Sequence, residues 1–143
     1  MKKKAIVSSL ILIISLVLIV SCSESTSSKI PSWIANKTWA GEVTTTVGEI
    51  SQTSSMVIVF DDNGIVGGAP EGAEIIYASK KDSLIVTEKY SSKQEGVTAK
   101  AEVNMTFTRI SDNECKVEGK GKTTVAGIST EMSLKGTLKA QSK

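Results

Sequence analysis

Histidine is absent from the 143 residues, and only two cysteines are present, Cys22 and Cys115. Without an imidazole the chain cannot build a catalytic serine or cysteine paired with a histidine base, a His-ligated zinc site or a histidine pH switch. No local pattern supplies a catalytic acid pair or an activated nucleophile instead. We therefore expect no catalytic residues, no metal ligands, no cofactor and a protein that is not an enzyme.

A strong excess of charge is lacking as well. The chain has 17 basic and 15 acidic residues, for a formal net charge of +2. Such a balance provides no general basic field for binding nucleic acid, so we expect no nucleic-acid partner. The length allows one domain with a modest core, and we expect a monomer.

The first twenty residues have the pattern of a secretory signal. Met1-Lys2-Lys3-Lys4 is positively charged, and the run Leu10–Val20 is apolar except for Ser15. Counted from Ala5 to Val20, the segment would form a helix of about 24 Å, shorter than the roughly 30 Å hydrocarbon core of a bilayer. A signal helix is therefore favoured over a permanent transmembrane helix.

The end of that run, Ile19-Val20-Ser21-Cys22, resembles the lipobox of bacterial lipoproteins. The resemblance implies cleavage between Ser21 and Cys22 and attachment of acyl chains such as palmitate to Cys22, which is enough for stable anchoring. Ser23 resembles the residue found there in lipoproteins sorted to the outer membrane. We expect a lipid-anchored protein of the bacterial cell envelope, the alternative being an ordinary signal peptide with a chance cysteine.

Cleavage would define three segments: the signal peptide 1–21, a lipidated cysteine with a flexible polar tether 22–29, and a folded domain 30–143. Removal of Lys2, Lys3 and Lys4 would leave 14 basic against 15 acidic residues, a net charge of −1. Cys115 would then have no disulfide partner, and we expect it to pack as a small apolar residue.

Alternating apolar and polar residues predict an all-β domain. A short helical turn at 30–35 leads into about eight strands of an antiparallel up-and-down meander. Their expected ranges are Thr38–Val47, Thr53–Phe60, Ile65–Val66, Ala73–Ser79, Leu84–Tyr90, Val97–Thr108, Glu114–Val125 and Thr130–Ala140. Loops are expected at Gly67–Gly72 and Ser91–Gly96.

The last three strands allow a prediction of register, because opposed residues of an antiparallel pair point to the same face. A three-residue loop Ser111–Asn113 places Phe107 opposite Val117 and Glu102 opposite Lys122. For the final hairpin, a two-residue turn Ile128–Ser129 fits the parity.

That final turn would place Gly121 opposite Gly136, where strands bend sharply or another group approaches the backbone. It would also bring Lys122 opposite Lys135, a mildly unfavourable contact between like charges.

Two short motifs are better explained as elements of the sheet. Gly119–Thr124 contains the Gly-Lys-Thr of a phosphate-binding loop, but Lys116 stands where that loop needs its first glycine. Asp61-Asp62-Asn63-Gly64 resembles part of a calcium loop, yet Pro70 stands where the glutamate ligand belongs, so a tight turn is favoured.

Lysines and glutamates alternate on the outward positions of the last two strands, which favours a solvated face of mixed charge over an anion-binding patch. These residues are Lys116, Lys120, Lys122, Lys135, Lys139, Glu114, Glu118 and Glu131.

The segment from Trp33 to Trp39, followed by about eight sequence-local strands, resembles a lipocalin-like or calycin barrel. Those families open their first strand with Gly-x-Trp, whereas Lys37 takes the place of the glycine here. The resemblance implies a small closed barrel over roughly residues 30–141. Trp33, Trp39 and Arg109 are candidates for closing one end, where Arg109 would either stack on Trp39 or extend to water.

An eight-stranded barrel has room for packed side chains or for one small ligand. Small and apolar residues at inward positions are candidates for lining a pocket: Ala99, Ala101, Val103, Met105, Val117, Gly119, Gly121, Leu134, Gly136 and Leu138. One hypothesis is a membrane-anchored protein that binds a small hydrophobic ligand. The alternative is a filled barrel, in which the small residues serve closure and the loops bind an envelope or host protein.

Overall fold

The computed structural model describes residues 25–26, 30–69 and 71–142. The predicted signal peptide, the cleavage site at Ser21 and the lipidation site at Cys22 lie outside these residues. Within them, no helix is long and apolar enough to cross a membrane.

Nine strands make up the described chain, and the all-β antiparallel fold predicted from the sequence is confirmed. They are β1 (Ser25–Thr26), β2 (Lys37–Val47), β3 (Ile50–Phe60), β4 (Ile65–Gly67), β5 (Glu74–Lys80), β6 (Ser83–Gln94), β7 (Val97–Ser111), β8 (Glu114–Val125) and β9 (Ile128–Ala140). The expected loop at Ser91–Gly96 is wrong, because β6 continues to Gln94 and only two residues turn the chain.

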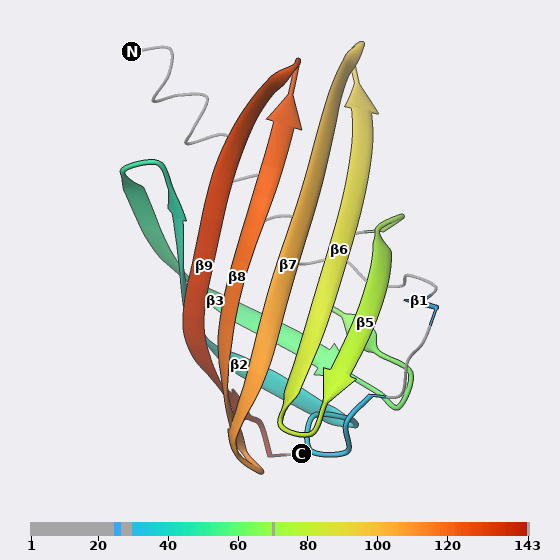
Figure 1. Ribbon diagram of the computed structural model, residues 1–143, viewed down its shortest axis with the longest axis vertical. Helices are drawn as coiled ribbons and strands as arrows, with labels where there is room; N and C mark the ends of the chain where they lie inside the picture. Colours follow the sequence, from blue (N-terminus) through green and yellow to red (C-terminus); the bar gives the residue numbers. More distant parts are fainter. Residues whose placement is uncertain (1–24, 27–29, 70, 143) are drawn as a thin grey trace.

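The strands form one curled sheet in the order β1-β5-β6-β7-β8-β9-β2-β3-β4 (Figure 1). The strands from β2 to β4 and from β5 to β9 pair antiparallel with their neighbours in sequence, β1 pairs in parallel with β5, and β9 pairs with β2, as in a closed barrel. In the described part of the chain, however, no ladder joins β4 to β5. The domain is thus a half-barrel, and the Tyr77 hydroxyl of β5 bridges the gap by accepting a 2.7 Å hydrogen bond from the Ile65 amide of β4.

The two ends of the half-barrel differ. At the closed end lie the turn 31–36 and the hairpin turns 81–82 and 112–113; at the open end lie the turns 48–49, 95–96 and 126–127. Backbone bonds tie the closed end together, including Arg109 N to Asp82 O at 2.8 Å and Ala140 N to Asn113 O at 2.9 Å.

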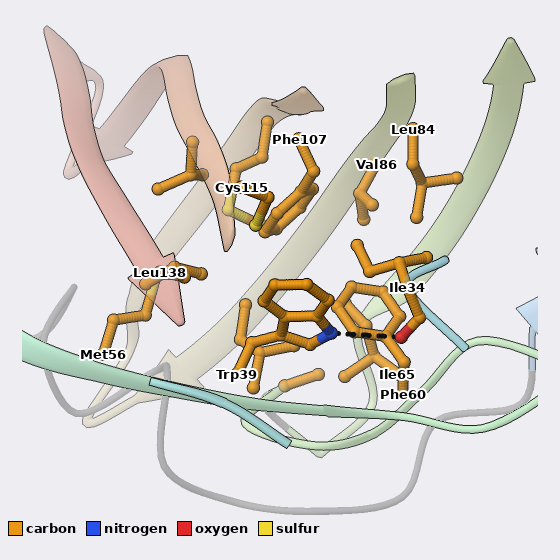
Figure 2. Packing of buried hydrophobic residues seen from close by; sticks show 14 of the residues in the cluster. Ile34, Trp39, Met56, Phe60, Ile65, Leu84, Val86, Phe107, Cys115 and Leu138 are labelled. Atoms are coloured by element: carbon orange, nitrogen blue, oxygen red, sulfur yellow. Dashed lines mark hydrogen bonds between the residues drawn. The ribbon is translucent and has the colours of Figure 1, made fainter. Parts of the chain in front are cut away.

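The core fills the half-barrel toward the closed end (Figure 2). Trp39 is fully buried and donates its indole N–H to the Ile34 carbonyl at 3.1 Å. The rings of Phe60 and Phe107 meet edge to face, with centroids 5.6 Å apart. Cys115 is free and fully buried, as expected.

The backbones of β2 and β9 approach each other closely along their ladder, which we call the seam. A Cβ atom at Gly136 would overlap the Glu42 carbonyl oxygen, and one at Gly41 would overlap the Thr137 carbonyl oxygen. Only glycine fits these two positions, so the seam that joins the first long strand to the last depends on them.

The predicted register of β7 and β8 is confirmed, with Phe107 opposite Val117 and Glu102 opposite Lys122. A bulge near Ile110 shortens the turn to Asp112-Asn113.

The predicted register of β8 and β9 is wrong, because the turn is Ala126-Gly127 and Gly121 faces Met132. The observed register sets Lys122 opposite Glu131 and Glu118 opposite Lys135, which replaces a repulsive pair by attractive ones.

Four strands extend past the rest of the sheet at the open end. The β2–β9 ladder stops at Val47 and Met132, while β6 to β9 continue beyond that level (Figure 1). We call this extension the overhang; it consists of residues 89–94, 97–102, 122–125 and 128–131. Among the described residues, β2 does not pair with the part of β9 that belongs to the overhang.

The seam can be tested with one added methyl group. Gly136→Ala should destabilise the domain by about 2 kcal/mol or more, because the methyl group meets backbone that cannot rotate away. Gly67→Ala is the control, since a Cβ there only touches Val59 at 3.4 Å. Urea unfolding of both variants measures the difference, and equal midpoints would contradict the assignment of the seam.

Candidate functional site

The ten residues predicted to line a pocket fall into two groups. Met105, Val117, Leu134 and Leu138 are buried in the core. The others, Ala99, Ala101, Val103, Gly119, Gly121 and Gly136, are only partly buried. The sequence pattern therefore placed all ten on one face of the sheet, and the tertiary structure shows which of them are buried and which are partly exposed.

The three glycines of the second group do not open a cavity. Leu134 Cγ would lie 2.9 Å from a Cβ at Gly119, and Met132 Cγ 3.0 Å from a Cβ at Gly121. Gly136 is in the seam described above. Large neighbours occupy the space that the glycines leave, as the alternative of a filled interior requires.

The inner face of the overhang is incompletely covered and combines apolar and hydroxyl side chains. One row contains Ser92, Ala99, Val125 and Ile128, and the next contains Tyr90, Ala101, Thr123 and Thr130. Val97 at the start of β7 is 44% exposed, and Ile128 is 65% exposed. Exposed apolar side chains that are grouped in this way are typical of surfaces that bind a ligand, a protein or a membrane.

Glu88 lies at the base of this face. It follows Leu84 and Val86 on the inward side of β6, it is opposite Ile75 and Val103, and it is 5% exposed. Burial disfavours the ionised form and raises the pKa of its carboxyl group to about 7. Glu88 is the one buried acid among the described residues. Its carboxyl group makes no hydrogen bond or ion pair with them.

Two other polar groups share the inner face. Thr123, in register with Ala101, is 3% exposed, and its hydroxyl has no hydrogen-bond partner in the described structure. Burial also raises the pKa of Tyr77, with a smaller opposing effect from its bond to Ile65. The unpaired hydroxyl of Thr123 offers a bound molecule a specific point of contact.

Glu88 and Thr123 were missed in the sequence interpretation, although a signal was available. Glu88 follows the inward residues Leu84 and Val86, and Thr123 stands at an inward position of β8 between Gly121 and Val125. A polar residue on the buried side of an alternating strand identifies such a position directly.

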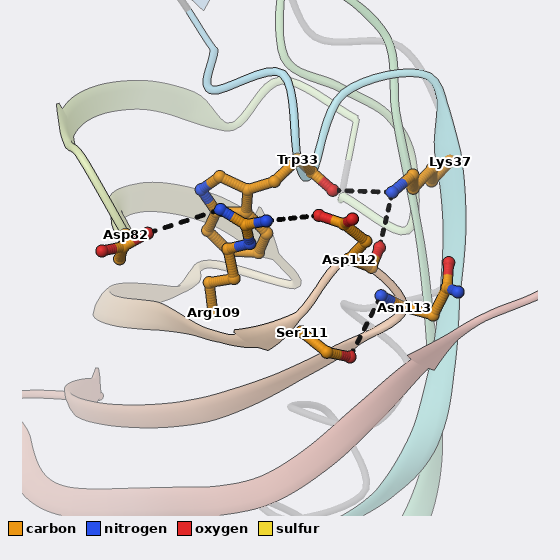
Figure 3. Close-up of polar contacts among 7 residues, drawn as sticks. All are labelled: Trp33, Lys37, Asp82, Arg109, Ser111, Asp112 and Asn113. Carbon is orange, nitrogen blue, oxygen red and sulfur yellow. Dashed lines mark hydrogen bonds and ion pairs between the residues drawn. The ribbon is translucent and has the colours of Figure 1, made fainter.

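The closed end contains the three residues predicted to close the barrel. The rings of Trp33 and Trp39 meet edge to face at 6.0 Å, and both are buried. Arg109 is 37% exposed and pairs with Asp82 at 3.6 Å and with Asp112 (Figure 3). The cation above the Trp39 ring is Lys37, at 5.6 Å, so the structure places Arg109 elsewhere than on Trp39.

Lys37, two residues before Trp39, makes two further bonds at the closed end. Its ammonium group donates to the Trp33 carbonyl at 3.0 Å and to the Asp112 carbonyl at 2.6 Å (Figure 3). A lysine at this position therefore joins the entry turn to the β7–β8 hairpin, which a glycine could not do.

The outer face of the sheet is polar and carries alternating charge. Its central row runs across β5 to β9. The members are Glu74, Lys89, Glu102, Lys122 and Glu131. An open groove of about 1050 Å³ lies along this row, lined mostly by outward-pointing positions. Mixed charge fits the predicted solvated face, and in the described chain no three acidic, cysteine or histidine side chains gather as a metal site would require.

Comparison with known proteins adds no relative: no protein-family model, no curated protein and no solved structure matches this chain.

The buried acid predicts a pH dependence of stability. Because the folded pKa of Glu88 is raised to about 7 from 4.5, the folded state holds its proton more tightly than the unfolded state. Stability should therefore fall as pH rises from about 4.5 to 7, by up to about 3 kcal/mol.

Glu88→Gln should remove this slope and make the protein more stable than wild type at pH 8. Glu102→Gln, on the outer face, should keep the wild-type slope. Thermal unfolding between pH 5 and 8 measures all three proteins, and a slope that survives in Glu88→Gln would refute the role of Glu88.

Proposed function

We propose that this protein is a lipid-anchored envelope lipoprotein that binds a small apolar molecule on the inner face of the overhang. The observation that carries the proposal is an uncovered apolar face with an unpaired buried acid at its base. The curled antiparallel half-barrel is compatible with a lipocalin-like ligand-binding fold. The lipobox-like sequence around Cys22 supports the anchor.

Binding would follow from burial of apolar surface. A ligand lying across Ala99, Ala101 and Val103 would remove apolar area from water at roughly 25 cal/mol per Å². Glu88, with a pKa of about 7, is present in both protonation states near neutrality and can donate or accept a hydrogen bond. The ligand that fits best is an apolar molecule with one polar group at the end nearest Glu88.

A second candidate function is non-enzymatic binding of an envelope or host protein through the loops. It is favoured by the filled core at the closed end and by large neighbours that occupy the space beside Gly119 and Gly121. The loop 67–72 is the remaining candidate surface for it, because Ser91–Gln94 belongs to β6. In both cases the protein acts as a monomer, without catalysis or a cofactor.

The ligand site can be tested with the neutral fluorescent probe N-phenyl-1-naphthylamine and a chain that begins at Ser23, free of acyl chains. The probe should bind wild type with increased emission. Ala101→Trp should lose at least about tenfold in affinity, because the indole occupies the inner face. Lys100→Trp, the adjacent outward position, should bind as wild type does.

Equal binding by both variants would refute the inner-face site. Native mass spectrometry of the same chain adds a second measurement: a protein purified without any bound small molecule, together with unchanged probe binding in Ala101→Trp, would favour the protein-binding alternative.

The anchor is tested separately. Cys22→Ala in the full chain should leave an unlipidated precursor with a shift in mass and no incorporated radiolabelled palmitate. Labelling followed by immunoprecipitation measures this. Cys115→Ala is the control and should be labelled normally, since the fully buried thiol is not a site of acylation. Labelling of Cys22→Ala would refute lipidation at that residue.

A further inference from the structure

The direction of β1 tells which end of the half-barrel lies nearer the proposed anchor. Ser25 and Thr26 pair in parallel with Ile75 and Ile76 of β5. Because β5 ends at the closed-end turn 81–82, β1 also runs toward the closed end. Ser25, the first residue of β1, therefore lies at the end of β1 that is nearer the open end.

Covalent geometry limits how far the anchor can be from this level. Three residues from Cys22 to Ser25 span at most about 10 Å in any conformation. The β6–β7 turn lies farther along: from Glu88, which is opposite Ile75, to Gln94 there are six residues, or roughly 20 Å of strand. The tips of the overhang thus reach about 10 Å or more past the farthest position of Cys22 along the strand direction.

These tips carry exposed apolar side chains beside a polar turn, since the exposed residues Glu95 and Gly96 connect β6 to β7. Val97, next to the β6–β7 turn, and Ile128, next to the β8–β9 turn, are 44% and 65% exposed. The Ala126 amide donates to the Thr98 carbonyl at 3.4 Å, which joins the two hairpins. We call Val97, Val125, Ala126 and Ile128 the rim.

Ala126 is an exposed apolar residue at the β8–β9 turn. Its φ of 50° lies in the left-handed region, and Gly127 follows with φ 78°. Two-residue turns of this kind favour asparagine, aspartate or glycine at the first position, so an alanine is held there at a cost in stability. The β6–β7 turn has the same backbone with Glu95 at φ 49°, so the rim combines one apolar and one charged turn.

We propose that the rim docks into the lipid bilayer, so that the open end of the half-barrel faces the membrane that carries the anchor. The inference rests on the proposed lipidation of Cys22. Because the rim extends at least as far as the anchor along the strand direction, it can reach the boundary between headgroups and acyl chains, where interfacial segments lie about 5–10 Å deep. The inner face of the overhang then opens toward lipid, and an apolar ligand reaches Ala101 and Val103 directly from the bilayer.

Two exposed isoleucines provide a matched pair for the test. Ile128 is 65% exposed on the rim, and Ile110 is 57% exposed at the closed end. About eleven residues of β7, or roughly 36 Å, separate Ala99, which lies near Ile128, from Ile110. The native Trp33 and Trp39 both lie at the closed end and give the same background in each variant.

Full-length Ile128→Trp and Ile110→Trp proteins, processed in cells, would be reconstituted into vesicles of phosphatidylethanolamine and phosphatidylglycerol. Half of the vesicles would carry brominated acyl chains, which quench tryptophan emission on close contact. The added emission of Ile128→Trp should be largely lost in brominated vesicles, and that of Ile110→Trp should be retained.

Vesicle flotation separates the possible failures. If the protein floats but Ile128→Trp is not quenched, or Ile110→Trp is quenched equally, the rim does not enter lipid and the inference is overturned while the anchor stands. If the protein does not float, the anchor and the inference fail together. Quenching at the rim alone supports the inference, whether or not the naphthylamine probe binds the inner face.

Discussion

The close approach of β2 and β9 at Gly41 and Gly136 is the constraint on which the rest of the structure depends. Without side chains at these two positions, the first long strand can lie against the last, and a meander becomes a half-barrel. The seam also ends early, at Val47 and Met132, because β2 turns there while β6 to β9 continue. The end of the β2–β9 ladder therefore separates the filled closed end from the overhang. The candidate site lies on the overhang because β2 stops before β6 to β9 do.

The two ends have different chemistry as a result. At the closed end, the tryptophans meet edge to face, the Lys37 ammonium group joins two turns, and Arg109 pairs with Asp82 and Asp112. At the open end, Glu88 and Thr123 are the buried polar residues of the described chain. The Thr123 hydroxyl has no hydrogen-bond partner there, and neither does the indole N–H of Trp33 at the closed end. The buried carboxyl group of Glu88 has no counterpart among the described residues of the closed end, and this is why we place binding at the open end.

Much of the sheet could be predicted from the sequence, because each strand alternates clearly and hairpin parity limits register. The β7–β8 pairing followed from this reasoning, and the β8–β9 pairing did not, since two turns satisfied the same parity. Charge was the available signal: the observed register pairs Lys122 with Glu131, while the rejected one pairs it with Lys135. The site was predicted less well, because alternation shows which residues face inward and cannot show what lies opposite them.

The sequence by itself determined the fold class, the absence of imidazole chemistry, the inward set of β7 to β9 and a lipobox-like motif at Cys22. These properties are local, since they depend on residue type and on a period of two along the chain. Only the tertiary structure decided that Gly119 and Gly121 are filled by neighbours, that Lys37 lies above Trp39, and that β4 and β5 stay unpaired within the described residues. These features depend on contacts between strands far apart in sequence. The alternation of residues within a strand does not show where β2 stops pairing with β9.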